Sequence, residues 1–165
     1  MLVYHPIFDI HHGLFRLCFI LDHHPSKEIH IDALRILDFY FLFPYLLSSF
    51  DFTQGAGKQG RLLAGPRSKY NMTASPETLL NHLRGLNHLT LTALASKNIL
   101  APADLELGVA RRTDVALPET IFDAAQERDI ELASYLATKL GTIPLYGPKG
   151  LKARSHLLEY RYDPV

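Results

Sequence analysis

Apolar residues recur at helical spacing in several stretches of the chain. Residues 9–22 predict a first helix, because apolar side chains fall there three or four residues apart, at Ile10, Leu14, Leu17, Cys18 and Leu21. Residues 31–45, IDALRILDFYFLFPY, are apolar almost all the way around a helix, and Pro44 ends the run. A helix of this kind needs cover on several sides. We therefore expect a central core element, a partner-facing element, or both.

This second helix carries local signals at and near its ends. Asp32 is a favourable N-cap residue. Arg35 and Asp38, three residues apart, are spaced to form an ion pair along the helix. The preceding residues 28–31 alternate between polar and apolar, which favours a short extended segment. Pro44 disfavours helix at the residue before it and starts a new turn.

The middle of the chain contains first a loop signal and then a helix signal. Residues 51–75 are rich in glycine and basic residues, which predicts a loop with one short helix over 58–64. The Ser-Pro-Glu sequence at 75–77 supplies a cap, a proline and an acid, the usual start of a helix. Gly85 is expected to divide the helix that follows into two parts, 76–84 and 86–97.

Residues 105–117 alternate with a period of two on both sides of a basic stretch. This pattern predicts two short strands around a tip at 110–114. Pro118 then opens another helix, which Gly141 ends. The apolar side of that helix is expected to face inward at Ile121, Phe122, Ala125, Ile130, Ala133, Leu136 and Leu140. Residues 158–162 alternate again and predict a closing strand.

Together these elements predict an α+β fold that is mainly helical. The order of helices and strands favours a winged helix-turn-helix-like core with a short β-hairpin and a C-terminal strand. Many small α+β domains share this order, so the winged core is one of several interpretations. We expect a single domain over residues 1–165, with 51–75 as a loop or hinge.

Composition and charge narrow the function classes. The chain has 17 Lys and Arg against 17 Asp and Glu, so its formal net charge is zero and any DNA contact needs a local patch. Cys18 is the single cysteine and cannot form an internal disulfide, which is typical of a reducing cytosol. The start of the chain lacks a signal-peptide pattern, and the most apolar window, 36–50, is shorter than the ~20 residues of a membrane span. We expect a cytoplasmic protein that does not contact a membrane.

No set of residues has the spacing that catalysis or metal binding requires. His11–His12 and His23–His24 are adjacent pairs that point in different directions on a helix, whereas a zinc site needs ligands on one face. We expect surface or capping histidines. Gly55–Lys58 resembles half of a phosphate-binding loop, but Phe52 and Gln59 stand where that loop requires glycine and serine or threonine. We therefore expect no enzyme activity, no cofactor and no metal.

Two basic features are candidates for DNA contact. One is the glycine-rich loop and the other is the predicted hairpin tip, and their residues are Lys58, Arg61, Arg67, Lys69, Arg111 and Arg112. The alternative is a solvated loop and an ordinary charged turn, because Lys and Arg are mostly exposed in any protein.

The C-terminal residues place charged and aromatic side chains on opposite faces of the predicted strand. This is either an edge strand with a solvated face or a strand that docks a partner, since Tyr and Arg are enriched at the centres of interfaces. The candidate partner-binding residues come from this end and from the apolar helix: Phe39, Tyr40, Phe43, Leu151, Lys152, Arg154, Glu159, Tyr160, Arg161 and Tyr162.

Two runs carry a resemblance to a known family. One is LRILDFYFLFP at 34–44, and the other is GPKGLKARS at 147–155 with LEYRYD at 158–163. The chain resembles, along roughly residues 5–163, the middle components of bacterial ABC-three-component systems of the Lamassu anti-phage type. Such proteins are similar to winged helix-turn-helix adaptors. They are encoded beside an SMC-like ATPase and an effector, often a nuclease, and are thought to help sense foreign DNA.

The resemblance also implies roles for individual residues. It implies that the core is organised by Arg35, Asp38 and Tyr40. It implies that the terminal turn and strand are held in shape, or dock a partner, through Lys152, Arg154, Glu159 and Arg161. No family motif assigns a DNA contact to a named residue.

The sequence therefore predicts a non-catalytic adaptor subunit that links an SMC-like ATPase to an effector and regulates it, with DNA reached through the complex. The alternative is a stand-alone winged-helix DNA-binding regulator, which needs the basic residues on one face. A third is a small hydrolase, which needs a pocket where carboxylates and a histidine converge. Because an adaptor's binding faces are apolar, we expect the isolated chain to self-associate or to be poorly soluble.

Overall fold

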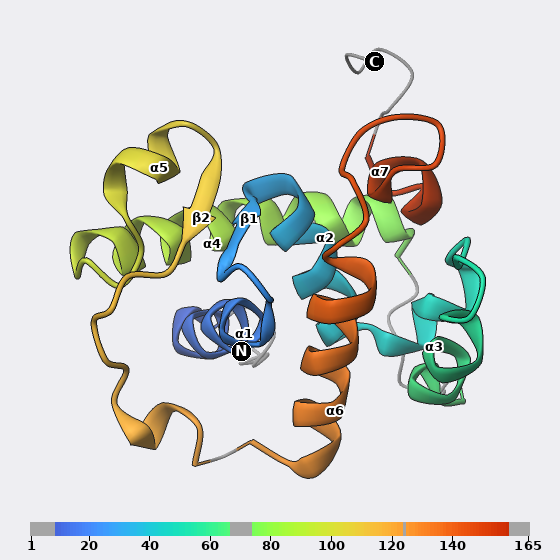
Figure 1. The fold of residues 1–165 in the computed structure, drawn as a ribbon, viewed down its shortest axis with the longest axis horizontal. Coiled ribbons are helices and arrows are strands. Elements are labelled where there is room, and N and C mark those ends of the chain that lie inside the picture. Colours follow the sequence, from blue (N-terminus) through green and yellow to red (C-terminus); the bar gives the residue numbers. More distant parts are fainter. Residues whose placement is uncertain (1–8, 67–73, 124, 159–165) are drawn as a thin grey trace, which may run out of the picture.

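The structure is a computed structural model that describes residues 9–66, 74–123 and 125–158 (Figure 1). It is mainly helical with a small antiparallel sheet, which confirms the predicted α+β class. The elements are, in chain order, α1 (Ile10–His23), β1 (Glu28–His30), α2 (Ile31–Leu42), η2 (Pro44–Ser49), α3 (Gly57–Ala64), α4 (Pro76–Ser96), α5 (Pro102–Glu106), β2 (Val109–Arg111), η3 (Glu119–Ile121), α6 (Glu127–Tyr135), η4 (Leu136–Leu140) and α7 (Leu151–Ser155).

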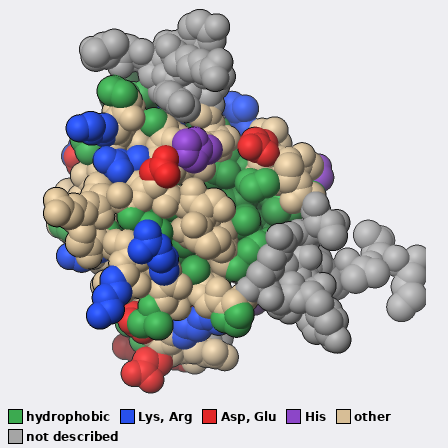
Figure 2. Space-filling model, turned by 90° about the vertical axis from the view of Figure 1, so that its right-hand side faces the viewer, with side chains coloured by type: hydrophobic (Ala, Val, Ile, Leu, Met, Phe, Trp, Pro, Cys, Tyr) green, Lys and Arg blue, Asp and Glu red, His purple; other side chains and the backbone are tan. Residues whose placement is uncertain are grey.

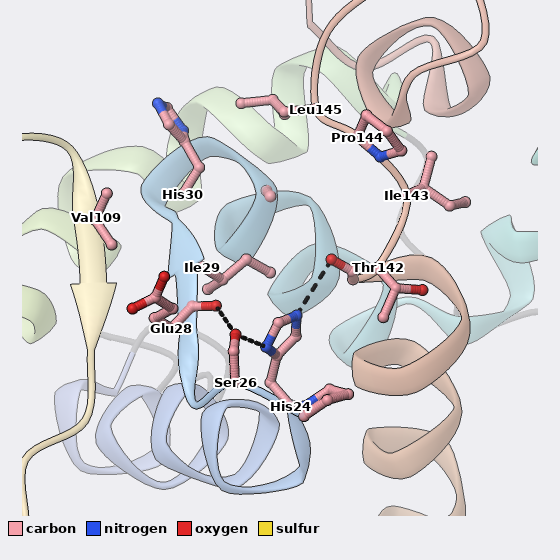
Figure 3. A pocket seen from close by; sticks show the side chains of 13 residues that line it. His24, Ser26, Glu28, Ile29, His30, Val109, Thr142, Ile143, Pro144 and Leu145 are labelled. Carbon is pink, nitrogen blue, oxygen red and sulfur yellow. Dashed lines mark hydrogen bonds between the residues drawn. The ribbon is translucent and has the colours of Figure 1, made fainter.

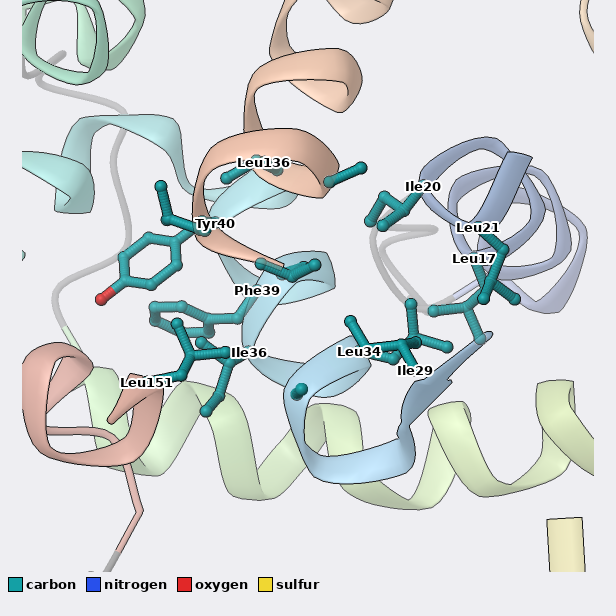
Figure 4. Packing of buried hydrophobic residues seen from close by; sticks show 14 of the residues in the cluster. Leu17, Ile20, Leu21, Ile29, Leu34, Ile36, Phe39, Tyr40, Leu136 and Leu151 are labelled. Atoms are coloured by element: carbon teal, nitrogen blue, oxygen red, sulfur yellow. The ribbon is translucent and has the colours of Figure 1, made fainter. Parts of the chain in front are cut away.

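Helix α2 is the central element of the hydrophobic core (Figure 4). Leu34, Ile36 and Phe39 are each 0% exposed. The helix contacts α1, α4, α6 and α7, so other parts of the same chain cover it on several sides. The apolar pattern of residues 31–45 therefore reflects a core helix.

Two local predictions for α2 are wrong. The N-cap residue is His30, whose Nδ1 accepts a hydrogen bond from the backbone N–H of Asp32 at 3.1 Å, so Asp32 lies inside the first turn. Asp38 does not pair with Arg35. It accepts hydrogen bonds of 2.7 and 3.3 Å from the guanidinium of Arg16 on α1, while Arg35 pairs with Asp32 at 3.0 Å. Both members of the Arg16–Asp38 pair are buried, so this ion pair joins two helices inside the core.

Helix α1 confirms the first predicted helix. Asp9 caps it by accepting a hydrogen bond from the backbone N–H of His11 at 2.7 Å. Gly13 is buried, and a Cβ at this position would lie 2.8 Å from Oγ1 of Thr90. The missing side chain therefore lets α1 approach α4 closely.

The sheet joins segments that are far apart in the sequence. Strand β1 pairs antiparallel with β2, with Ile29 opposite Ala110. Two backbone hydrogen bonds of 3.0 Å place residues 99–101 along the other edge of β2. The hairpin predicted over 105–117 around a tip at 110–114 is wrong, because its first half forms the end of α5 and strand β2, and the strand partner of β2 is β1.

Helix α4 is unbroken through Gly85, so the predicted division into two helices is wrong. Ser75 caps it, as predicted, by accepting a hydrogen bond from the backbone N–H of Thr78 at 3.2 Å. Gly85 is exposed and only lowers the helix propensity locally. The short helix predicted over 58–64 is confirmed as α3.

Helix α6 begins later than predicted. Pro118 opens only the short η3 turn, and α6 starts after Gln126, whose backbone N–H donates to the carboxylate of Asp129 at 3.0 Å. The helix continues through η4 and ends at Gly141, as predicted. Ile130, predicted to face inward, is 47% exposed. At the C-terminus, α7 follows a turn, and all of the predicted strand over 158–162 except Leu158 lies outside the described residues.

Candidate functional site

An open cleft of about 540 Å³ lies along one edge of β1 (Figure 3). One wall is the segment from the end of α1 through β1, and the other is the irregular segment 141–145 that follows η4. This volume is in the range of ligand and peptide sites. The apolar part of its lining includes Ile29, Val109, Ile143 and Pro144.

Strand β1 presents an unpaired edge to this cleft. The carbonyl of Lys27 and the N–H of Ile31 form hydrogen bonds of 2.9 Å with the residues that flank β2. Because such groups alternate along an antiparallel ladder, the N–H groups of Glu28 and His30 point away from β2. Figure 3 shows β2 on one side of β1 and the segment 141–145 on the other, and Val109 of β2 also lines the cleft. Neither N–H has a hydrogen-bond partner among the described residues.

His24 connects the two walls of the cleft. Its Nε2 lies 3.3 Å from the carbonyl oxygen of Gly141, and its Nδ1 lies 3.1 Å from the hydroxyl of Ser26. A carbonyl oxygen only accepts, so Nε2 carries a hydrogen. The Ser26 hydroxyl also donates to the carbonyl of Glu28 at 3.0 Å. The Ser26 hydroxyl therefore lies between the His24 ring and the carbonyl on the edge of β1.

His30 connects the cleft to α7. Because its Nδ1 accepts the capping hydrogen bond of α2, the neutral ring carries its hydrogen on Nε2. That nitrogen lies 3.4 Å from the hydroxyl of Tyr146. The ammonium of Lys152 lies 5.0 Å from the centre of the Tyr146 ring, a cation–π contact. A continuous line of contacts thus runs from the edge of β1 to α7.

Arg154 holds the turn before α7 in place. Its Nε donates to the carbonyl of Lys149 at 2.6 Å, and its Nη1 donates to the carbonyl of Asp51 at 2.8 Å. The carboxylate of Asp51 in turn pairs with His156 at 2.8 Å. These contacts fasten α7 to the segment after η2, which is one of the two roles that the resemblance implies for Arg154.

A family model for the ABC-three component (ABC-3C) system Middle Component 5 matches residues 2–163. The chain belongs to the Middle Component 5 family. No curated protein and no solved structure matches it. The resemblance carried by residues 34–44 and 147–163 is therefore confirmed at the level of ABC-three-component systems. A middle component is one part of a multi-component system, so protein partners are implied.

In this Middle Component 5 chain the predicted aromatic contact residues lie inside the core. Phe39, Tyr40 and Phe43 are all buried. The hydroxyl of Tyr40 donates to the carbonyl of Ser155 at 3.5 Å, and burial raises the pKa of this tyrosine, with the Asp51 carboxylate adding to the effect. A role for these three residues in partner binding stays a prediction, and it requires the core to open.

The other predicted partner-binding residues are at the C-terminal end. Leu151 and Lys152 are buried on α7, and Arg154 makes the contacts described above. The remaining four, Glu159, Tyr160, Arg161 and Tyr162, lie outside the described residues.

The predicted DNA-binding residues fall in two separate places. Lys58 and Arg61 are exposed on α3, whereas β2 lies on the opposite side of the molecule (Figure 1). Figure 2 looks onto the side that carries α3 and α7, and it shows several Lys and Arg side chains spread between apolar ones. Arg67 and Lys69 lie outside the described residues.

Arg111 and Arg112 are not at a free basic tip. Arg111 pairs with Glu28 at 3.0 Å and with Asp104 at 3.4 Å. Arg112 pairs with Asp22 at 2.8 Å. Carboxylates of the same chain therefore offset both charges. Direct contact of these residues with DNA stays a prediction.

The thiol of Cys18, the single cysteine, is buried. Burial raises the pKa of Cys18 to about 12, although the nearby Arg112 guanidinium acts in the opposite direction. The group is therefore a neutral thiol near pH 7 and a poor nucleophile. Within the described ranges, no group of three His, Cys, Asp or Glu side chains is placed to hold a metal ion. No helix there is long and apolar enough to cross a membrane.

The sequence patterns did not identify the residues of the cleft. His24 and Gly141 are 117 positions apart, and no local spacing relates them. The available signals were the alternation at 28–31, which does predict β1, and Gly141, which does end the preceding helix. Neither signal shows that these two segments face each other.

Proposed function

We propose that this chain is a non-catalytic adaptor of its ABC-3C system, and that it binds an extended segment of another component in the cleft beside β1. The unpaired edge of β1 supports this most strongly, because free backbone N–H groups beside an apolar wall suit strand addition. Carbonyl oxygens of the partner segment would accept from Glu28 and His30. Its apolar side chains would lie against Ile143 and Pro144.

The energetics of such binding favour the apolar walls over the backbone. A strand of three residues supplies few hydrogen bonds, each of net value about 1 kcal/mol. Apolar burial contributes about 25 cal/mol per Å² before the cost of association is subtracted. The walls therefore supply most of the affinity, and the edge of β1 fixes the direction and register of the segment.

The partners that we propose follow the family resemblance. They are an SMC-like ABC ATPase and an effector subunit, often a nuclease, of a Lamassu-type anti-phage system. The adaptor would hold the effector to the ATPase and release or restrain it when foreign DNA is sensed. DNA would be reached through the complex, in keeping with the zero net charge of this chain.

We also propose that residues 10–113 form a winged-helix-like unit. Helix α1, strand β1, helix α2, helix α4 and strand β2 follow one another in the order expected for that fold, with η2 and α3 inserted before α4. The segment 99–101 adds a third extended segment to the sheet beside β2, and α5, which connects that segment to β2, occupies the position of the wing. A helix in place of an extended wing distinguishes this unit from the hairpin predicted from the sequence.

The adaptor proposal is tested with a variant that blocks the cleft. Thr142 is exposed on the cleft wall, and Thr142→Arg would place a long charged side chain across the opening. All components of the system are co-expressed, and the affinity-tagged chain is purified. We expect the wild type to retain the ATPase or the effector and Thr142→Arg to lose it.

Thr92→Arg is the matched control for this experiment. Thr92 is also exposed, and both hydroxyls donate to the carbonyl four residues earlier, at 2.9 Å for Thr92 and 3.1 Å for Thr142. Equal melting temperatures of the two variants show that both fold. Retention of the partners by Thr142→Arg, or equal loss in both variants, contradicts docking in the cleft.

The second candidate is a DNA-binding regulator, which the winged-helix order and the exposed cations of α3 favour. It predicts that the isolated chain binds duplex DNA with a steep salt dependence, about 0.9 logarithmic units of affinity per phosphate contacted for each tenfold change in salt. Fluorescence anisotropy with a labelled duplex measures this slope. DNA binding that appears only when the ATPase is present supports the adaptor instead.

A further inference from the structure

The edge of β1 that is not paired with β2 offers hydrogen-bond donors, but its carbonyls are already engaged. In an antiparallel ladder, the N–H and the C=O of one residue point to the same side. The carbonyls of Glu28 and His30 therefore point away from β2 together with their N–H groups. Both N–H groups lack a partner among the described residues, so they are available to a bound segment.

The two carbonyls are engaged within the chain itself. The carbonyl of Glu28 accepts a hydrogen bond from the hydroxyl of Ser26 at 3.0 Å (Figure 3). His30 is the N-cap residue of α2, and the carbonyl of an N-cap residue accepts the first hydrogen bond of its helix. The carbonyl of His30 is therefore committed by the fold, whereas that of Glu28 depends only on the exposed side chain of Ser26.

This excess of donors decides which segments fit beside β1. A partner segment in β conformation, parallel or antiparallel, directs both the C=O and the N–H of every second residue toward β1. Its carbonyls accept from Glu28 and His30. The N–H that faces the carbonyl of His30 finds no free acceptor, and its desolvation is not compensated. Proline has no N–H and avoids this cost.

The surroundings of His30 are also suited to a proline ring. The rings of His30 and Tyr146 lie edge to face, with their centroids 5.9 Å apart, and Tyr146 is 38% exposed. Ala33 and Leu145 add apolar surface to the lining of the cleft. Proline-rich segments dock in grooves lined by aromatic side chains, in an extended conformation that loses little entropy on binding.

We propose that the segment bound beside β1 is extended and carries a proline opposite His30. This proposal rests on the adaptor function proposed above and names the chemistry of the partner segment. Pairing of two copies through this edge is disfavoured, because the N–H groups of each copy would face carbonyls that are already engaged. The occupant is therefore a proline-containing segment of another component of the system.

The test uses the isotope-labelled full chain and three synthetic peptides, each flanked by serines for solubility. Leucine alternates with proline in the first, with N-methylalanine in the second and with alanine in the third. Nuclear magnetic resonance follows the amide signals of Glu28 and His30 during titration. We expect dissociation constants of about a millimolar for the first two peptides. Binding of the alanine peptide should be about tenfold weaker, since it alone carries the extra N–H.

Ser26→Ala separates hydrogen bonding from the stiffness of the peptides. It frees the carbonyl of Glu28, so the alanine peptide gains an acceptor and the other two gain none. We expect the alanine peptide alone to bind about fivefold more tightly to this variant. Ser48→Ala is the matched control, because Ser48 is also exposed, lies outside the cleft lining and donates to a backbone carbonyl, that of Tyr45, at 2.8 Å.

Equal binding of the alanine and proline peptides, or equal tightening of all three by Ser26→Ala, overturns the proline requirement and leaves the cleft as a docking site. If no peptide shifts the two amide signals, the proposal is also overturned, and co-purification with Thr142→Arg decides separately whether the cleft docks a partner. Shifts that depend on protein concentration alone would identify a second copy on this edge. Slow hydrogen exchange of both amides in the isolated chain would identify cover by the chain itself, and either result overturns the proposal.

Discussion

At the scale of single residues, the buried Arg16–Asp38 ion pair is the contact from which an effect on stability can be predicted most directly. The two side chains are 4% and 0% exposed and lie 2.7 Å apart, between α1 and α2. Removing one charge leaves the other buried without a partner. We expect Asp38→Asn to lower the free energy of unfolding by about 3–5 kcal/mol, measured by urea denaturation.

Asp32→Asn is the control for this prediction. It removes the same charge from the same helix, but the pair that it breaks with Arg35 is partly exposed. We expect a loss of about 1 kcal/mol or less. Equal losses for Asp38→Asn and Asp32→Asn would show that burial does not set the value of the Arg16–Asp38 pair.

The same pair shows what sequence spacing can and cannot tell. Spacing along α2 correctly places Arg35 and Asp38 one turn apart, and on that ground it predicts their ion pair. It holds no information on a cation 22 residues earlier that packs against the same helix. Once α1 packs on α2, the buried Arg16 is available to Asp38, and Arg35 pairs with Asp32, three residues earlier, instead.

At the scale of elements, two helical glycines predict opposite effects of the same substitution. Gly60 is buried in α3, where a Cβ would collide with the ring of Phe52 and the hydroxyl of Tyr135. Gly85 is exposed in α4, and a Cβ there would have no neighbour within 4 Å. We expect Gly60→Ala to destabilise the protein by about 1–3 kcal/mol. Gly85→Ala should stabilise it by about 0.5–1 kcal/mol.

Thermal unfolding of both variants beside the wild type checks this pair of predictions. Each variant serves as the control for the other, because the chemical change is identical. A rise in melting temperature for Gly60→Ala would mean that α3 moves away from Phe52 and Tyr135 at little cost. A fall for Gly85→Ala would mean that α4 requires glycine for a reason other than helix propensity.

Element boundaries were predictable where the signal is local. Ser75 with Pro76 starts α4, and Gly141 ends the preceding helix, because caps act through their own neighbours. The strands were harder. The alternation at 105–109 fits a strand, but Pro102 starts a short helix there. Only the position of β1, some 80 residues earlier, determines which residues of this region become β2.

At the scale of the whole molecule, burial of three weak acids predicts alkaline sensitivity. Burial raises the pKa of Cys18 to about 12, from 9.0, and that of Tyr135 to about 12, from 10.0. Burial also raises the pKa of Tyr40. Each group stays neutral in the folded chain while it ionises in the unfolded chain. Their contribution to stability is therefore complete below about pH 9 and is lost as the pH rises toward the folded-state values.

Part of the fall in the free energy of unfolding with rising pH can be assigned to Cys18. Between pH 9.0 and about 12, Cys18 alone lowers the free energy of unfolding by about 1.4 kcal/mol per pH unit. Urea denaturation at about pH 8 and about pH 10 measures the total slope. Cys18→Ala removes the thiol at a constant packing cost of about 1 kcal/mol, which cancels when the two pH values are compared. The variant should therefore lose less stability than the wild type over this interval. Equal slopes for the two proteins would mean that the thiol is solvated in the folded state, and that α1 is not packed against the core as tightly as the structure describes.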